Sequence, residues 1–232
     1  MKNKQNAEPL RRESSTLDVH SIFFTLQGEA IHTGRPAVFI RLAGCNLQCP
    51  NCDTDYTSTR RTMSIADIVE EVWKHNTRLV VITGGEPFRQ QFSHLIEVMP
   101  NHEFQVETNG LLCPEWAMAL LNTSDKFKVV ISPMTEKIDS RWETVRHSSI
   151  MYKYVMSYLH VDAFDGLPLS ILGKANRRPA RPWSGNHACV YLQPEDTGKT
   201  YANRKSIDAC VKSCMTYGYT LCLQTQKIVN LP

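Results

Sequence analysis

The sequence lacks several features that would place it in other classes of protein. No run of about 18 apolar residues occurs, which excludes a membrane-spanning helix. The polar residues 1–16 contain no apolar core of the kind a secretion signal needs, so we expect a cytoplasmic protein. Only 11 glycines and 12 prolines occur among 232 residues, which excludes collagen-like and low-complexity chains. A net charge of +3 is too small to indicate nucleic-acid binding by itself.

Enough apolar material is present for one folded unit. Apolar residues make up 42% of the chain and charged residues 21%, which is typical of a globular protein. The length favours one domain over two. Residues 1–17 carry few apolar side chains, so we expect a flexible N-terminal tail followed by a single domain over residues 18–232.

Apolar runs and helical patterns alternate along the chain. Strands are expected at residues 19–25, 37–42, 79–82, 103–107, 127–131, 151–155, 189–192 and 219–223. Helices are expected at residues 65–73, which Ser64 can cap, then near 92–99, at 114–121 and at 201–217. Such alternation predicts an α/β fold with parallel strands joined by right-handed crossovers.

Most of the expected strands end in small or polar residues. Thr83, Glu107, Ser132, Gln193 and Gln224 follow five of them. Because ligands bind at the carboxyl ends of parallel strands, these residues predict one polar binding mouth. The alternative is that they are ordinary polar turns.

Eight cysteines need an explanation in a reducing compartment, where disulfides are rare. Cys45, Cys49 and Cys52 form the pattern C-x3-C-x2-C within eight residues. A structural zinc site usually has four ligands, and no second cysteine pair lies nearby. Three thiolates on one loop fit a 4Fe-4S cluster with one iron left open for a small ligand. A zinc site with a distant fourth ligand is the alternative.

A glycine-rich segment strengthens the iron–sulfur interpretation. Gly84, Gly85 and Glu86 precede Pro87 directly after an expected strand, and the glycines would let the backbone approach a ligand closely. Together with the cysteine pattern, this GGEP segment resembles the signature of the radical S-adenosylmethionine (SAM) superfamily. The resemblance implies that the open iron binds SAM and that an electron from the cluster cleaves the cofactor to give a 5′-deoxyadenosyl radical.

Longer segments narrow the resemblance. The chain contains, in order, TLQGE at 25–29, TGRPAVFIRL at 33–42, GCNL at 44–47, CDT at 52–54, VVITGGEP at 80–87, VETNG at 106–110, LQP at 192–194 and LQT at 223–225. These segments resemble the 7-carboxy-7-deazaguanine synthase family. The resemblance implies a partial, open β/α barrel of about six parallel strands with reduced helices. It also implies conversion of 6-carboxy-5,6,7,8-tetrahydropterin to 7-carboxy-7-deazaguanine, with loss of ammonia, in queuosine biosynthesis.

The resemblance assigns roles to individual positions. For SAM, it implies that Gly84, Gly85 and Glu86 hold the methionine end, that Asn109 and Ser132 face the ribose, and that Gln193 faces the adenine. For the pterin, the residues it implies are Gln27, Gly28, Glu29, Arg41 and the terminal Pro232.

Ordinary roles remain open for several of these positions. The planar fork of Arg41 suits a carboxylate, although a surface salt bridge is the alternative. Gln27 and Glu29 could instead form a polar turn, and Pro232 a frayed terminus. Thr54 is implied to bind Mg²⁺ that also contacts the substrate, with Asp53 as a rival ligand.

Three positions depart from the family pattern. Ala30 stands where glycine is usual, Gln226 replaces a histidine, and Met134 replaces a lysine that commonly follows Ser-Pro. These differences affect the expected substrate pocket and leave the cluster ligands intact.

Other signals have simpler interpretations. Cys210 and Cys214 lie on one apolar helix face, which favours core thiols over a second cluster that would include Cys222. The Arg- and Pro-rich residues 177–183, within a loop at 172–187, favour a solvated loop over a nucleic-acid site. A glycyl-radical activase and a non-catalytic iron–sulfur or zinc module remain as alternative functions. The family resemblance further implies a homodimer and an electron donor such as flavodoxin.

Overall fold

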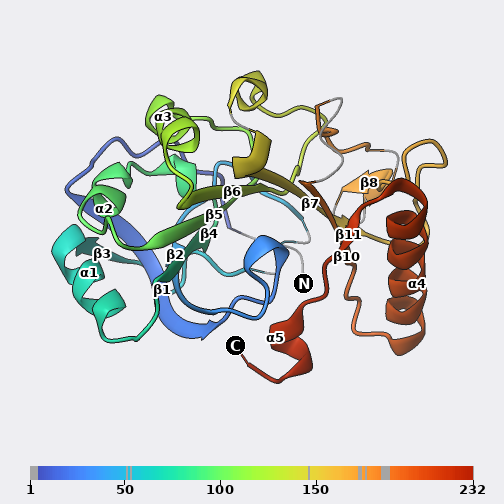
Figure 1. The fold of residues 1–232 in the computed structure, drawn as a ribbon, viewed down its shortest axis with the longest axis horizontal. Helices are drawn as coiled ribbons and strands as arrows, with labels where there is room; N and C mark the ends of the chain where they lie inside the picture. The colour runs from blue at the N-terminus through green and yellow to red at the C-terminus, as the bar shows by residue number, and fades with distance from the viewer. Residues whose placement is uncertain are drawn as a thin grey trace.

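A computed structural model describes residues 5–50, 52, 54–145, 147–171, 174–175, 177–183 and 189–231. Its centre is one curved sheet of nine strands in the order β11-β10-β7-β6-β5-β4-β2-β1-β3 (Figure 1). Seven of these strands run parallel: β2 (Pro36–Leu42), β4 (Leu79–Gly84), β5 (Glu103–Thr108), β6 (Phe127–Ile131), β7 (Ile150–Met156), β10 (Val190–Pro194) and β11 (Thr220–Leu221). β1 (Thr16–Leu26) and β3 (Arg61–Ser64) pair antiparallel at one edge. The sheet is open, as expected, because β3 and β11 lie at opposite edges.

Short helices connect the strands. They are α1 (Ile65–Trp73), α2 (Ser93–Glu97), α3 (Glu115–Thr123), α4 (Thr200–Tyr217) and α5 (Thr225–Ile228), with 3-10 turns η1 (Ala30–His32), η2 (Pro87–Arg89), η3 (Ser140–Thr144) and η4 (His147–Ser149). A small hairpin joins β8 (Ser170–Ile171) to β9 (Lys174–Ala175). In Figure 1, α1 to α4 lie around the outside of the sheet. No helix in the described ranges is long and apolar enough to cross a membrane.

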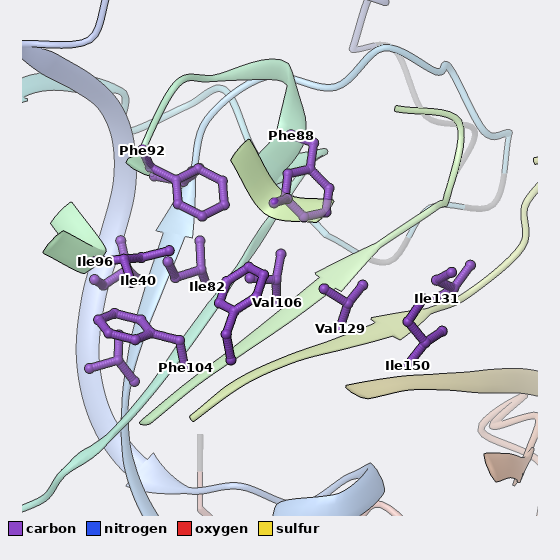
Figure 2. Packing of buried hydrophobic residues seen from close by; sticks show 14 of the residues in the cluster. Ile40, Ile82, Phe88, Phe92, Ile96, Phe104, Val106, Val129, Ile131 and Ile150 are labelled. Atoms are coloured by element: carbon purple, nitrogen blue, oxygen red, sulfur yellow. The ribbon is translucent and has the colours of Figure 1, made fainter. Parts of the chain in front are cut away.

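The two faces of the sheet differ because side chains alternate along each strand. Outward-facing residues such as Ile40, Ile82, Val106 and Val129 form the main core with apolar side chains from the connecting segments, as Figure 2 shows for Phe88 and Phe92. The inward-facing residues are apolar at the amino ends of the strands, where Ala37, Leu79 and Val81 cluster. Nearer the carboxyl ends they become polar. One face therefore stabilises the fold while the other supplies a site.

The elements expected from the sequence are mostly confirmed. Each expected strand is present with small differences in its ends, and Ser64 caps α1 through a capping box with Asp67. Trp73, the last residue of that helix, is 66% exposed, although its spacing places it with the apolar residues Ile65, Ile68, Val69 and Val72 that are buried. The core role of Cys210 is confirmed, since its side chain is fully buried.

Residues 5–17, expected to form a flexible tail, contact the domain in the structure. Strand β1 begins at Thr16, and Leu17 is fully buried. Upstream of it, the backbone N–H of Glu8 donates to the Cys45 carbonyl at 2.7 Å, and that of Arg11 donates to the Arg89 carbonyl at 2.7 Å. The segment docks through hydrogen bonds and ion pairs, which a count of apolar side chains does not detect.

Candidate active site

A cavity of about 790 Å³ opens on the inner face of the sheet at the carboxyl ends of its parallel strands. Its wall is mostly polar. It includes the five strand-end residues expected to form a binding mouth: Thr83, Glu107, Ser132, Gln193 and Gln224. The structure therefore brings these five residues to one cavity, as the sequence pattern predicts.

The cysteine loop borders this cavity. Its base is closed by a hydrogen bond from the Gly44 N–H to the Tyr56 carbonyl at 3.0 Å. Cys52 and Thr54 line the cavity, whereas Cys49 lines a separate hollow beside it. Cys45 is buried at the start of the loop, and the Leu47 N–H donates to its sulfur at 3.4 Å. The arrangement places the loop at one side of the cavity mouth.

Gly84 and Gly85 allow two backbone segments of the protein to approach each other closely. A Cβ added to Gly84 would lie 2.1 Å from the Leu42 carbonyl oxygen, and one added to Gly85 would lie 2.1 Å from that of Gly44. Gly84 also has φ +136°, in the region that favours glycine. Neither residue lines the cavity. The glycines therefore admit the strand that leads into the cysteine loop, and their expected contact with SAM stays a prediction.

Glu86 and Asn109 are likewise directed into the protein. The Glu86 carboxylate is fully buried and accepts hydrogen bonds from the Phe88 N–H, the Thr108 hydroxyl and the Asn109 N–H, at 2.7–3.0 Å. Burial raises the pKa of Glu86 to about 7, although these three hydrogen bonds oppose the shift. The Asn109 amide donates to the Asn46 side chain at 2.8 Å. Both residues fix the loops below the cysteines and do not line the cavity.

Two polar clusters form the cavity floor. In the first, the Glu107 carboxylate accepts hydrogen bonds from the side chains of Gln27 at 3.1 Å and Thr83 at 3.2 Å. In the second, Glu29 forms an ion pair with Lys153 and accepts a hydrogen bond from Gln224 at 2.8 Å. Burial alone would raise the pKa of Glu29, but the Lys153 charge and the hydrogen bonds from its neighbours lower it overall. Glu29 is therefore held as a carboxylate.

Arg41 also reaches the cavity. Its guanidinium lies over the Phe23 ring, 5.7 Å from the ring centroid. Among the described residues, no carboxylate lies within ion-pair distance of it. The surface salt bridge considered for Arg41 is therefore not found in the described part of the chain.

The remaining predicted positions have different placements. Gly28 does not line the cavity, and a Cβ there would lie 1.4 Å from the Gln226 side-chain oxygen, so this glycine admits the C-terminal segment. Met134 and Gln226 line the cavity. Ala30 has φ +59°, which explains why glycine suits this position. Asp53 and Pro232 lie outside the described residues, as do residues 172, 173, 176 and 184–187 of the 172–187 loop.

Comparison with known proteins decides the family. The radical SAM superfamily matches residues 39–147. The 7-carboxy-7-deazaguanine synthase of Rhodospirillum rubrum is 32% identical over 231 residues, which cover 94% of each chain. The chain belongs to the 7-carboxy-7-deazaguanine synthase family. The Rickettsia prowazekii synthase is 30% identical and covers 96% of this chain and 92% of its own.

The family assignment agrees with the fold. The crystal structure of QueE from Escherichia coli matches with a TM-score of 0.64 at 22% identity, covering 90% of this chain and 93% of that chain. Radical SAM membership implies a SAM cofactor and a 4Fe-4S cluster. The chain is accordingly a radical SAM enzyme.

The described cysteines suit that cluster. The three cysteines lie on one loop at the side of the cavity, and burial raises the pKa of Cys45 to about 12. Within the described ranges, no three His, Cys, Asp or Glu residues meet tightly enough to hold one metal ion. In a 4Fe-4S cluster each thiolate binds a separate iron, so the three thiolates need not converge on one metal ion.

Sequence reasoning missed Lys153. This residue lies in the middle of β7, where the pattern indicates only an ordinary strand. Its partner Glu29 is 124 positions away in the sequence. The sequence does indicate a buried charge here, because Lys153 is flanked by apolar strand residues and a buried lysine needs a partner.

Proposed function

We propose that this enzyme converts 6-carboxy-5,6,7,8-tetrahydropterin to 7-carboxy-7-deazaguanine with loss of ammonia, the reaction that the family name and the queuosine pathway indicate. The observation that carries the proposal is the opening of the cysteine loop into a polar cavity. Cys52 and Thr54 line the same cavity as Gln27, Glu29 and Arg41. A cluster at the loop and a polar heterocycle on the floor would then be neighbours.

The floor of the cavity suits the donor and acceptor edge of a pterin. Glu29 and Glu107 present carboxylate oxygens, while Gln27, Gln224 and Thr83 orient them. Arg41 supplies a planar fork for the substrate carboxylate. The Thr54 hydroxyl supplies an oxygen for Mg²⁺, a cation that takes few protein ligands and retains water.

The SAM cofactor would lie between the cysteine loop and the ends of β6 and β10. Ser132 and Gln193 line this part of the cavity, and the buried Gln193 side-chain oxygen has no hydrogen-bond partner in the described part of the chain. That oxygen can accept a hydrogen bond from the adenine amino group. The other residues predicted at the SAM site support it by fixing the backbone that carries Cys45 and Asn46. They are Gly84, Gly85, Glu86 and Asn109.

When bound, the cluster and SAM supply a radical that removes a substrate hydrogen atom. The chain contributes placement: Cys45, Cys49 and Cys52 hold the cluster, and the charged floor orients the pterin toward it. Placement of this kind accounts for a large part of catalysis by cofactor enzymes. A buried floor also keeps water and competing hydrogen donors away from the reacting atoms.

The test is anaerobic turnover. Protein reconstituted with iron and sulfide is incubated with 6-carboxytetrahydropterin, SAM, Mg²⁺ and a reductant, and the products are measured by mass spectrometry. The proposal predicts 7-carboxy-7-deazaguanine, and Cys45→Ala, Cys49→Ala or Cys52→Ala abolishes it. Cleavage of SAM without any deazapurine would contradict the proposal and favour the activase alternative.

Three further properties complete the proposal. The enzyme works in the cytoplasm, where its reduced thiols agree with eight free cysteines. A small protein such as flavodoxin donates the electron. Two copies of the chain assemble as a homodimer.

A further inference from the structure

The N-terminal segment crosses the base of the cysteine loop. We define the strap as residues 5–11 and the cluster loop as residues 44–56. The Gln5 side chain donates to the Thr54 carbonyl at 2.9 Å and accepts from the Tyr56 N–H at 2.7 Å. At the other side of the loop, the Glu8 N–H donates to the carbonyl of Cys45 at 2.7 Å. The strap therefore contacts both ends of the cluster loop, including the backbone of one proposed cluster ligand.

A buried arginine joins the strap to the segment before the loop. The Arg89 guanidinium is 4% exposed and donates to the carbonyls of Pro9 at 3.0 Å and Ala43 at 2.9 Å. Its charge is balanced by Glu8 at 3.5 Å and Asp18 at 3.8 Å. It also packs on Gly44, where an added Cβ would lie 2.6 Å from its Nη2 atom. Arg89 thus fixes the strap and the first residues of the cluster loop to the same point.

The cluster loop needs such support. It closes on itself through the Gly44 to Tyr56 hydrogen bond, and the residues described between these two, all except 51 and 53, form no helix or strand. A loop with few internal hydrogen bonds opens locally more readily than the strands that flank it. Each opening would separate the three thiols, since they lie within that span.

We propose that the strap holds the cluster loop in its ligating conformation and thereby slows loss of the iron–sulfur cluster. This inference rests on the proposed function for the presence of the cluster. The strap residues act by positioning the loop and touch neither substrate nor cofactor. The cluster would be retained because the loop is already ordered before the thiolates bind iron.

The test compares variants of the strap. Gln5→Ala removes the side-chain contacts with Thr54 and Tyr56, and a chain starting at residue 16 removes the whole strap. Asn6→Ala is the matched control, because Asn6 is an exposed neighbour of Gln5 in the same segment. Transfer of iron from the reconstituted protein to an excess of ferrous chelator is followed by absorbance. We expect release about tenfold faster from Gln5→Ala, faster still from the shortened chain, and unchanged from Asn6→Ala.

A second pair isolates the contact with Cys45. Glu8→Pro removes the N–H that donates to the Cys45 carbonyl, whereas Glu8→Ala keeps that N–H and removes only the carboxylate. Faster iron release is expected from Glu8→Pro than from Glu8→Ala. Equal rates in this pair would contradict a role for the backbone contact.

Hydrogen exchange of the metal-free protein gives a readout that does not depend on the cluster. The Gly44 and Tyr56 amides should exchange about tenfold faster in Gln5→Ala, with the midpoint of global unfolding unchanged. Unaltered exchange and unaltered iron release in the strap variants would overturn the inference. If the unmodified protein takes up no cluster, the proposed function fails instead, and the exchange data still decide whether the strap orders the loop.

Discussion

Arg41 is the residue whose proposed role is easiest to separate from the others, because its guanidinium faces the cavity and lies over Phe23. Arg41→Ala removes the fork proposed to bind the substrate carboxylate, and such a charged pair contributes about 2 kcal/mol. We expect KM for the pterin to rise about thirtyfold while SAM cleavage without substrate persists. Steady-state kinetics measure the first effect, and 5′-deoxyadenosine formation measures the second. Failure to assemble the cluster in this variant would show that Arg41 has a structural role instead.

Lys153 and Glu29 form a second residue-scale unit, with each side chain 11% exposed. Lys153→Met leaves the Glu29 carboxylate buried beside Glu107 without its cation. We expect a loss of about 3 kcal/mol in the free energy of unfolding at neutral pH, measured with denaturant. Lys212→Met, at an exposed position, is the control and should change stability by less than about 0.5 kcal/mol.

The pH dependence of this pair has a definite sign. The lowered pKa of Glu29 means that its contribution is present above its unfolded pKa and is lost as the pH falls through the folded value. In Lys153→Met, only the hydrogen bonds with Gln224 and Gln226 still oppose burial, so we expect that pKa to rise. The difference in stability between the two proteins should therefore shrink toward pH 4.5. A difference that is constant from pH 7.5 to pH 4.5 would contradict the ion-pair account.

The contribution of Glu86 to stability should depend on pH in the opposite sense. Burial raises its folded pKa from 4.5 to about 7, so its contribution is fully present below pH 4.5 and is lost as the pH rises through 7. At about 1.4 kcal/mol per pKa unit, the change amounts to roughly 3 kcal/mol. Unfolding of the metal-free protein should show that Glu86→Gln has a smaller decline in stability between pH 5 and pH 8. An identical decline in both proteins would assign the pH dependence to other groups.

At the scale of elements, the junction between β2 and β4 determines how the cluster loop begins. Gly85→Ala would place a methyl group 2.1 Å from the Gly44 carbonyl oxygen, so the backbone must shift. We expect a loss of stability of about 2 kcal/mol or more, together with faster iron release. Gly198→Ala is the control for steric contact, because no atom lies within 4 Å of the added methyl group. Its φ of +70° adds only backbone strain. That substitution should cost only about 1 kcal/mol of backbone strain and leave the iron in place.

Sequence patterns predicted the parallel strands because each one carries a short apolar run with a polar end. Thr83, Glu107 and Ser132 were assigned to one mouth on this basis, and the structure places them there. The patterns could not predict which partner each polar group selects. Glu86 turns toward the protein because it accepts from buried N–H groups such as that of Asn109, and the Asn109 side-chain amide donates to Asn46 Oδ1. Both choices depend on long-range contacts. The four-residue β3 was also missed, since only its pairing with β1 makes it a strand.

At the scale of the whole molecule, the curved sheet separates two tasks. Its outer face holds the apolar core, and its inner face carries the charged floor beside the cysteine loop. Under the proposed function, this arrangement would let one chain of modest size hold a reactive cofactor and a polar substrate at neighbouring positions. The substrate hydrogen to be removed would then face the cofactor across the cavity.

Isotope transfer tests this arrangement most directly. The reconstituted enzyme is given 6-carboxytetrahydropterin deuterated at C6, the position from which we propose that hydrogen is removed, and the 5′-deoxyadenosine formed is analysed by mass spectrometry. The account predicts deuterium in the 5′-deoxyadenosine, together with formation of 7-carboxy-7-deazaguanine. Formation of 5′-deoxyadenosine without deuterium, in the presence of bound substrate, would contradict it.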